Sequence, residues 1–278
     1  MHVVRFDDVT SFAARAEPWL LEREAEHNLL LGIVNQLRGG HHAYQSPTYL
    51  AVMEDGGRVV GCAFRTPPFG VGLTRMPLDA VSLLVNDVHR VYESIPRTVG
   101  PPELAKAFSV QWADRTGCQW RSMMRQRIYA LTRVHFPTKP PPGVLRLAVP
   151  GDIALVESWA ESFVRDTHVG ALGNEQLAPQ LIAEQALYIW DDGQPRSMAA
   201  ARGPTPNGIR IGFVYTPDEF RGRGYASACV AGVSQVQLDA GRTFCFLYTD
   251  LANPTSNSIY SKMGYEPVCD SLMTEFAH

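Results

Sequence analysis

Apolar residues recur at three- and four-residue intervals in some segments of the chain and alternate with polar residues in others. The first pattern is typical of helices that cover a core, and the second of strands with one buried face. In the first half, this predicts helices over 10–21, 24–37, 78–93 and 102–115, a hairpin over 48–55 and 58–66, and a long strand or bent strand pair over 120–134.

The second half repeats this order of elements. It predicts strands over 145–148, 187–192, 196–201, 209–215 and 243–249, helices over 153–165, 175–186, 222–240 and 254–263, and further strands at the end. A tandem duplication of one α/β (α+β) fold explains the repetition. Three consecutive prolines at 140–142 favour an extended connector. We therefore expect domains over 1–137 and 144–278, joined by a linker over 138–143.

Composition and charge narrow the class of protein. The chain has 278 residues, 45% of them apolar and 19% charged, as expected of soluble globular domains. A net charge of −3 argues against a nucleic-acid partner. No apolar run approaches the roughly 18 residues that span a bilayer, and the acidic N-terminal segment is unlike a signal peptide. We predict a cytoplasmic protein with no membrane partner.

The cysteines and histidines do not form a metal-binding pattern. Five cysteines lie far apart, at positions 62, 118, 229, 245 and 269, with no pairing at metal-ligand spacing. Reduced thiols are the simplest interpretation. Cys229 and Cys245 fall in apolar stripes, which favours packing over nucleophilic roles. His41-His42 lacks nearby ligand partners, so we predict no metal.

The segment from Val214 to Gly241 carries the most chemical information. A buried strand ends at Thr216-Pro217, and the turn RGRG then opens a helix with one apolar stripe. Free N–H groups of a first helical turn bind anions, and glycines let a phosphate approach the backbone. Arg221 and Arg223 add positive charge, so a pyrophosphate would suit this place. The alternative is a plain strand-to-helix turn that needs glycine only for its geometry. A Walker lysine-serine pair and the full GxGxxG pattern are both absent.

Two signatures resemble one known family. The run RGRGYA, 221–226, resembles the R/Q-x-x-G-x-G/A signature of the GCN5-related N-acetyltransferases (GNATs), and VYTP is the usual approach to it. The run NPTSNSIYSKMGY, 253–265, resembles the second signature of that family. The resemblance covers 143–276 and implies two tandem GNAT-like domains, each a mixed, mostly antiparallel sheet flanked by helices. It also implies acetyl-CoA as cosubstrate and direct transfer of its acetyl group to a primary amine.

The resemblance also implies roles for individual residues. The pyrophosphate would be bound by backbone amides of Gly222, Arg223, Gly224, Tyr225 and Ala226, beside Arg221. The remaining coenzyme contacts would come from Val214, Tyr215, Asn253, Asn257 and Tyr260. Val214 and Tyr215 would pair with the pantetheine arm, and the Val214 N–H would polarise the thioester carbonyl. Asn253 and Tyr260 would reach the arm and the sulfur.

The proton transfers are less well specified by the sequence. Tyr260 is the candidate general acid for the leaving thiolate, the alternative being a helix tyrosine packed with its hydroxyl in water. Asp250 is one candidate base for the acceptor ammonium, but it could equally cap the turn before Asn253. Glu275 and His168 are weaker candidates, and a water chain could replace any single base.

The first half departs from the family pattern. Where the phosphate turn should occur it reads GLTRMPLDAVSLL, 72–84, with proline in place of glycine. We therefore interpret it as a degenerate copy without a coenzyme site. The acceptor would be a small-molecule, amino-acid or peptide amine, and the apolar stripes are compatible with a homodimer. The competing hypothesis is a non-catalytic acyl-CoA-binding sensor or scaffold.

Overall fold

The chain forms two compact units that exchange segments. The computed structural model describes residues 1–40, 48–167 and 177–277. Unit 1 contains Met1–Ile128, Thr249–Asn253 and the residues from Pro267 onward, and unit 2 contains Tyr129–Tyr248 and Pro254–Glu266. Parts of the second repeat therefore belong to unit 1. The predicted domain limits, 1–137 and 144–278 with a linker at 138–143, describe the two sequence repeats and stay a prediction.

Unit 1 has the predicted helices and hairpin, together with three short strands that the sequence did not reveal. Its elements are β1 (His2–Phe6), α1 (Val9–Leu21), α2 (Asn28–Arg38), β2 (Tyr49–Asp55), β3 (Arg58–Arg65), β4 (Val71–Leu73), α3 (Ala80–Val91), β5 (Arg97–Gly100), α4 (Pro102–Thr116), most of β6 (Gln119–Leu131) and nearly all of β12 (Glu266–Ala277). The predicted start of the second helix at residue 24 is wrong. The backbone turns between the two helices, with the His27 N–H donating to the Arg23 carbonyl, and α2 begins four residues later than predicted.

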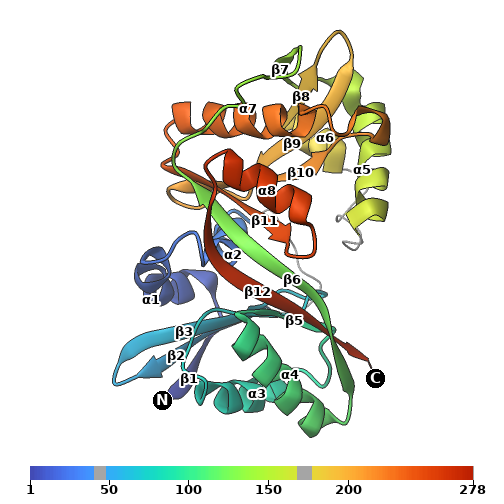
Figure 1. Cartoon of the computed structure of the whole chain (residues 1–278). Coiled ribbons are helices and arrows are strands. Elements are labelled where there is room, and N and C mark those ends of the chain that lie inside the picture. Colours follow the sequence, from blue (N-terminus) through green and yellow to red (C-terminus); the bar gives the residue numbers. More distant parts are fainter. Residues whose placement is uncertain (41–47, 168–176, 278) are drawn as a thin grey trace. The chain divides into compact units, whose positions relative to one another are not determined.

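The sheet of unit 1 has the order β1-β2-β3-β4-β5-β12-β6 (Figure 1). Neighbours from β1 to β4 are antiparallel, β4 and β5 are parallel, and β12 is antiparallel to β5. Side chains alternate between two cores because successive residues of a strand face opposite sides. Leu50 and Val52 pack with α1 and α2, whereas Tyr49 and Ala51 pack with α3 and α4. Each face of the sheet is thus covered by one helix pair.

Unit 2 is built in the same way. Its elements are β7 (Val144–Leu147), α5 (Ile153–Thr167), α6 (Leu177–Ala183), β8 (Leu187–Asp191), β9 (Pro195–Arg202), β10 (Gly208–Tyr215), α7 (Tyr225–Asp239), most of β11 (Phe244–Asp250) and α8 (Pro254–Lys262), with short 3-10 turns at Pro150–Asp152 and Asp218–Phe220. The start of the predicted helix over 175–186 lies outside the described residues. The predicted final strands are one long strand, β12.

The pairing pattern of unit 2 repeats that of unit 1. Strands β7, β8, β9 and β10 are antiparallel neighbours in that order, and β10 is parallel to β11. In both repeats a helix pair follows the first strand, and one helix joins the two parallel strands. The α7 and α8 helices cover one face, and α5 and α6 cover the other. The predicted fold class, two tandem mixed and mostly antiparallel domains, is confirmed.

The remaining class-level features concern thiols, metals and membranes. All five cysteines are free, and burial raises the pKa of both Cys229 and Cys245 to about 12. These two side chains are fully buried in the core of unit 2, in agreement with the packing interpretation. Among the described residues, no helix is long and apolar enough to span a bilayer. Nor do they contain a group of three acidic, histidine or cysteine side chains that could hold a metal ion.

Candidate functional site

The turn before α7 has the geometry that only glycine adopts easily. Gly222 has a φ of 74° and Gly224 a φ of 85°, and Gly224 forms the N-cap of the helix. This left-handed region is costly for residues with a Cβ atom. A Cβ atom added at Gly222 would meet nothing within 4 Å, and one at Gly224 would meet only Pro141 at 3.8 Å. The glycines are therefore required by backbone conformation, and they leave space above the turn.

The N–H groups at this turn are available to a ligand. In the part of the chain that the structure describes, none of the backbone N–H groups from Gly222 to Ser227 donates a hydrogen bond. The first to do so is that of Ala228, which donates to the Gly224 carbonyl at 3.0 Å. Unpaired donors at a helix start, aligned with the helix dipole, favour an anion.

The corresponding turn of unit 1 is different. It joins β4 to α3 and contains Pro77 but no glycine. Two of its helix-start donors are already used, because Ala80 N–H donates to the Pro77 carbonyl at 3.0 Å and Val81 N–H to the Leu78 carbonyl at 3.2 Å. The two repeats therefore differ in backbone donors as well as in sequence.

The two arginines of the turn have different surroundings. Arg221 Nε donates to the Thr216 carbonyl at 3.0 Å, and its other nitrogens lie 2.6 Å from Asp166 and 2.7 Å from Asp218. The hydrogen bond to Asp166 contributes most to raising the Arg221 pKa. Arg221 thus fixes the turn against α5 and is largely neutralised. Arg223 is exposed, and within the described ranges it forms no ion pair. Arg223 is the better placed of the two to add charge for an anion.

A second set of contacts anchors the first residue of α7. The Tyr225 hydroxyl donates to Asp192 at 2.7 Å, and Asp192 is also paired with Arg196. These two partners, Tyr225 first, lower the pKa of Asp192. The Arg196 guanidinium lies 4.3 Å from the centre of the Phe220 ring, which meets the Tyr225 ring edge-on. The turn before α7 is thereby tied to the β8–β9 hairpin. Asp191-Asp192-Gly193 is a sequence typical of hairpin turns, and it joins β8 to β9, with the Gly193 N–H donating to the Asp191 carboxylate at 3.0 Å.

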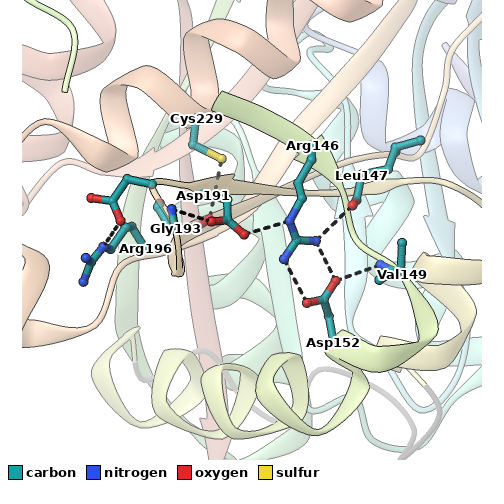
Figure 2. Close-up of polar contacts among 10 residues, drawn as sticks. Arg146, Leu147, Val149, Asp152, Asp191, Gly193, Arg196 and Cys229 are labelled. Carbon is teal, nitrogen blue, oxygen red and sulfur yellow. Dashed lines mark hydrogen bonds and ion pairs between the residues drawn. The ribbon is translucent and has the colours of Figure 1, made fainter. Parts of the chain in front are cut away.

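An arginine holds that hairpin to the start of α5 (Figure 2). Arg146 forms two hydrogen bonds to Asp152, of 2.7 and 3.0 Å, and a third of 2.9 Å to Asp191. Asp152 also accepts the Val149 N–H at 2.8 Å. The arginine contact is the largest of the effects that lower the pKa of Asp152. Two-pronged pairs of this kind fix orientation as well as distance, so the elements around the site are rigidly connected.

Strand β10 is distorted just before the turn. Gly212 pairs with Ala200 and Tyr215 with Met198, so Phe213 and Val214 together face a single residue of β9. This β-bulge gives Phe213 a φ of 53°, a left-handed value that costs a non-glycine residue of order 1–3 kcal/mol. The parallel ladder with β11 covers Gly208 to Arg210 and ends before the bulge. The distortion thus lies at Phe213 and Val214, directly before Tyr215, and so includes one of the two predicted pantetheine-binding residues.

Tyr260, the predicted general acid, lies on α8. Tyr260 is half-buried, packs against the α7 core and meets the Tyr265 ring edge-on at 5.9 Å. Burial raises the pKa of Tyr260 to about 12. Asn257, one turn earlier, accepts a hydrogen bond of 3.3 Å from the Tyr129 hydroxyl.

The candidate bases are in less favourable positions for that role. Asp250 ends β11, where its carboxylate accepts the Ala252 N–H at 2.8 Å and its carbonyl accepts the Asn253 N–H at 3.0 Å. These bonds match the turn-capping alternative. Asp250 and Asn253 belong to unit 1. Glu275 belongs to unit 1 as well, and its carboxylate lies 2.6 Å from the Arg121 guanidinium. His168 lies outside the described residues.

Comparisons with known proteins agree on the fold. Residues 190–273 match the family model described as FR47-like protein. A Drosophila protein aligns with a TM-score of 0.71 and 11% identity, over 99% of this chain and 98% of its own. A GNAT-family acetyltransferase from Colwellia psychrerythraea aligns with a TM-score of 0.59 and 11% identity, over 100% of both chains. A tandem GNAT protein from the clavulanic acid biosynthesis pathway aligns with a TM-score of 0.54 and 13% identity, over 99% and 98%. No curated protein matches the chain.

Proposed function

From the tandem GNAT fold of this chain, we propose that it is an N-acetyltransferase that uses acetyl-CoA. The acetyl group would pass to a primary amine of a small molecule, amino acid or peptide, by direct attack of the amine in a ternary complex. One observation carries the proposal: the N–H groups from Gly222 to Ser227 have no acceptor among the described residues, and they lie beside two glycines in the left-handed region. A coenzyme pyrophosphate is an anion that suits such a turn.

Different groups of the chain would bind different parts of acetyl-CoA. Backbone amides of Gly222 to Ala226 would take the pyrophosphate, with Arg223 adding charge, while Arg221 keeps the turn in place. Val214 and Tyr215 would hold the pantetheine arm at the distorted end of β10. Asn253 and Asn257 would reach the arm. When bound, acetyl-CoA supplies the acetyl group as a thioester.

The bulge in β10 would serve the chemical step. Attack on the thioester places negative charge on the carbonyl oxygen, which needs a donor aimed at it. Inserting one residue into a strand redirects its backbone groups, and the cost at Phe213 supports a functional reason for keeping the distortion. We assign the Val214 N–H as that donor.

Tyr260 would act on the leaving sulfur. A hydroxyl whose pKa is raised to about 12 keeps its proton throughout the neutral range. This pKa lies above the value of about 8.5 for a free thiol, so the hydroxyl is the weaker acid. We therefore expect Tyr260 to stabilise the developing thiolate by donating a hydrogen bond to it, while keeping its own proton. The acceptor ammonium would lose its proton to Asp250 or to a water chain.

The coenzyme site is tested by thermal unfolding with and without acetyl-CoA. At a ligand concentration of about 100 Kd, binding stabilises the folded state by about 2.7 kcal/mol, which raises Tm by roughly 5–10 °C in a chain of this size. Gly224→Glu places bulk and negative charge at the N-cap and should abolish this rise. An equal rise in both proteins would show that the coenzyme binds elsewhere, and no rise in wild type would contradict the proposal.

A further inference from the structure

Unit 1 contains a cavity of about 590 Å³ that the proposed reaction does not use. One side is formed by the end of α1 and the α1–α2 connection, with Trp19, Arg23 and His27. The other is formed by the start of β3 and the β4–α3 turn, with Val59, Arg75 and Met76. Cavities of this size hold metabolite-sized ligands.

His27 is one of the lining residues, and its ring has a buried acceptor without a hydrogen-bond partner among the described residues. Its side chain is only 3% exposed, and its ring stacks on Trp19 with a centre distance of 4.7 Å. Nδ1 lies 2.9 Å from the Leu20 carbonyl. Because a carbonyl can only accept, Nδ1 carries the proton, and Nε2 of the neutral ring is an acceptor. Burial lowers the pKa of His27 and keeps the ring neutral, while Nε2 has no hydrogen-bond partner among the described residues.

The charged groups of the cavity favour an anion. Arg23 and Arg75 both line it, and each lowers the pKa of His27, which puts both positive charges within electrostatic reach of the ring. Arg23 lies 3.6 Å from Glu26, and within the described ranges Arg75 forms no ion pair. Glu22 also lines the wall, which leaves one net positive charge among the lining residues in a chain whose total charge is −3.

The position of the cavity in the duplicated fold is a second argument for an anion site. The β4–α3 turn, which supplies Arg75 and Met76, stands where the second repeat has its phosphate turn. There the first repeat lacks the glycines, and the first two N–H groups of its helix are already bonded, yet the cavity beside it has cationic side chains. Recognition in unit 1 would therefore rest on side chains, whereas that in unit 2 rests on the backbone.

We propose that this cavity binds a small organic carboxylate with an apolar or aromatic body and one O–H or N–H donor. Arg75 and Arg23 take the carboxylate, since a guanidinium matches its geometry. The apolar body lies against Val59 and Met76, and the donor satisfies His27 Nε2. The site is separate from that for acetyl-CoA and does not depend on the proposed transfer reaction.

The test uses 4-hydroxyphenylacetate as probe, with phenylacetate, which lacks the donor, and 4-hydroxyphenylacetamide, which lacks the charge. Binding to the full chain is followed by titration calorimetry and by the ¹⁵N chemical shift of His27 Nε2. We expect saturable binding of 4-hydroxyphenylacetate, accompanied by a shift of the Nε2 resonance that phenylacetate does not cause. The amide should bind about tenfold more weakly or worse.

Arg75→Gln should weaken binding of the probe by about tenfold or more. Arg58→Gln is the matched control, because Arg58 is an exposed arginine of the same unit that does not line the cavity. If Arg75→Gln fails to fold, Arg23→Gln replaces it, and the Nε2 shift in wild type stands as an independent test. The proposal is overturned by no saturable binding up to about 10 mM, by equal affinity in Arg75→Gln, or by competition from acetyl-CoA.

Discussion

Replacing Gly222 by alanine tests the proposed phosphate-binding turn with the smallest change available. The added Cβ atom meets nothing within 4 Å, so the protein itself is not crowded. Gly241, at the other end of the same helix, is a matched control. Its φ is 95°, compared with 74° for Gly222, and a Cβ atom there also meets nothing within 4 Å. The two substitutions therefore share a backbone cost but differ in distance from the proposed pyrophosphate.

The size of each effect follows from these angles. A left-handed conformation costs an L-residue about 1–2 kcal/mol, and reduced freedom of the unfolded chain offsets part of it. Both variants should thus lose about 1 kcal/mol of stability, or roughly 2–4 °C in Tm. Acetyl-CoA at about 100 Kd adds about 2.7 kcal/mol to wild type. If the methyl group of Gly222→Ala weakens binding about tenfold, the same concentration adds only about 1.4 kcal/mol.

The assay is a thermal melt of wild type, Gly222→Ala and Gly241→Ala, each with and without acetyl-CoA, followed by calorimetry of binding. We expect equal melting temperatures for the two variants alone, and a ligand-induced rise in Gly222→Ala about half that of Gly241→Ala. Identical ligand-induced rises in Tm in the two variants would refute the reasoning, because a methyl group at Gly222 should weaken the binding of a pyrophosphate that these amides hold.

Two further predictions concern Tyr260 and Asp152. Tyr260→Phe should lower kcat about 100-fold with little change in acetyl-CoA affinity. In wild type, burial raises the pKa of Tyr260, so ionisation of Tyr260 should not lower kcat below about pH 10. Binding of acetyl-CoA without turnover on any amine would favour the sensor hypothesis instead. Because Arg146 lowers the folded pKa of Asp152, its stabilisation is present above about pH 4 and is lost as pH falls through that lower pKa. Asp152→Asn should cost about 1–2 kcal/mol at pH 7. The free energies of unfolding of the two proteins, measured with denaturant, should converge towards pH 2, and a constant difference between them over this range would contradict the assignment.

Regular elements with long periodic patterns could be predicted from the sequence. The helix over 222–240 is α7, and the hairpin around Gly56-Gly57 is β2 and β3. Strands β1, β4 and β5 were missed because three to five residues are too few to show a period. The pairing of β12 with β5 could not be read either, since it joins residues more than 150 positions apart and no local pattern records it.

The site was predictable where chemistry follows directly from residue type. RGRG before an apolar stripe indicated the glycine turn, and its left-handed angles agree. The bulge at Phe213 left no trace, because 209–215 alternates as a regular strand would. The hydrogen bond from the Tyr225 hydroxyl to Asp192 was equally hidden, since it joins a helix to a hairpin turn 33 residues earlier.

The place of β12 in unit 1 has a consequence for how the protein is made. The β12 register pairs Leu272 with Gly100, and the Thr274 hydroxyl bonds to Ser109, 165 residues earlier. While the chain is being synthesised, β5 therefore has an unpaired edge that its final neighbour reaches only after the second repeat has been translated. Unpaired edges invite wrong pairing, and distant contacts slow folding. We expect unit 1 to complete its fold only after β12 has left the ribosome, so that protection of the β5 amides from hydrogen exchange appears in chains that include β12 and not in nascent chains stalled before it.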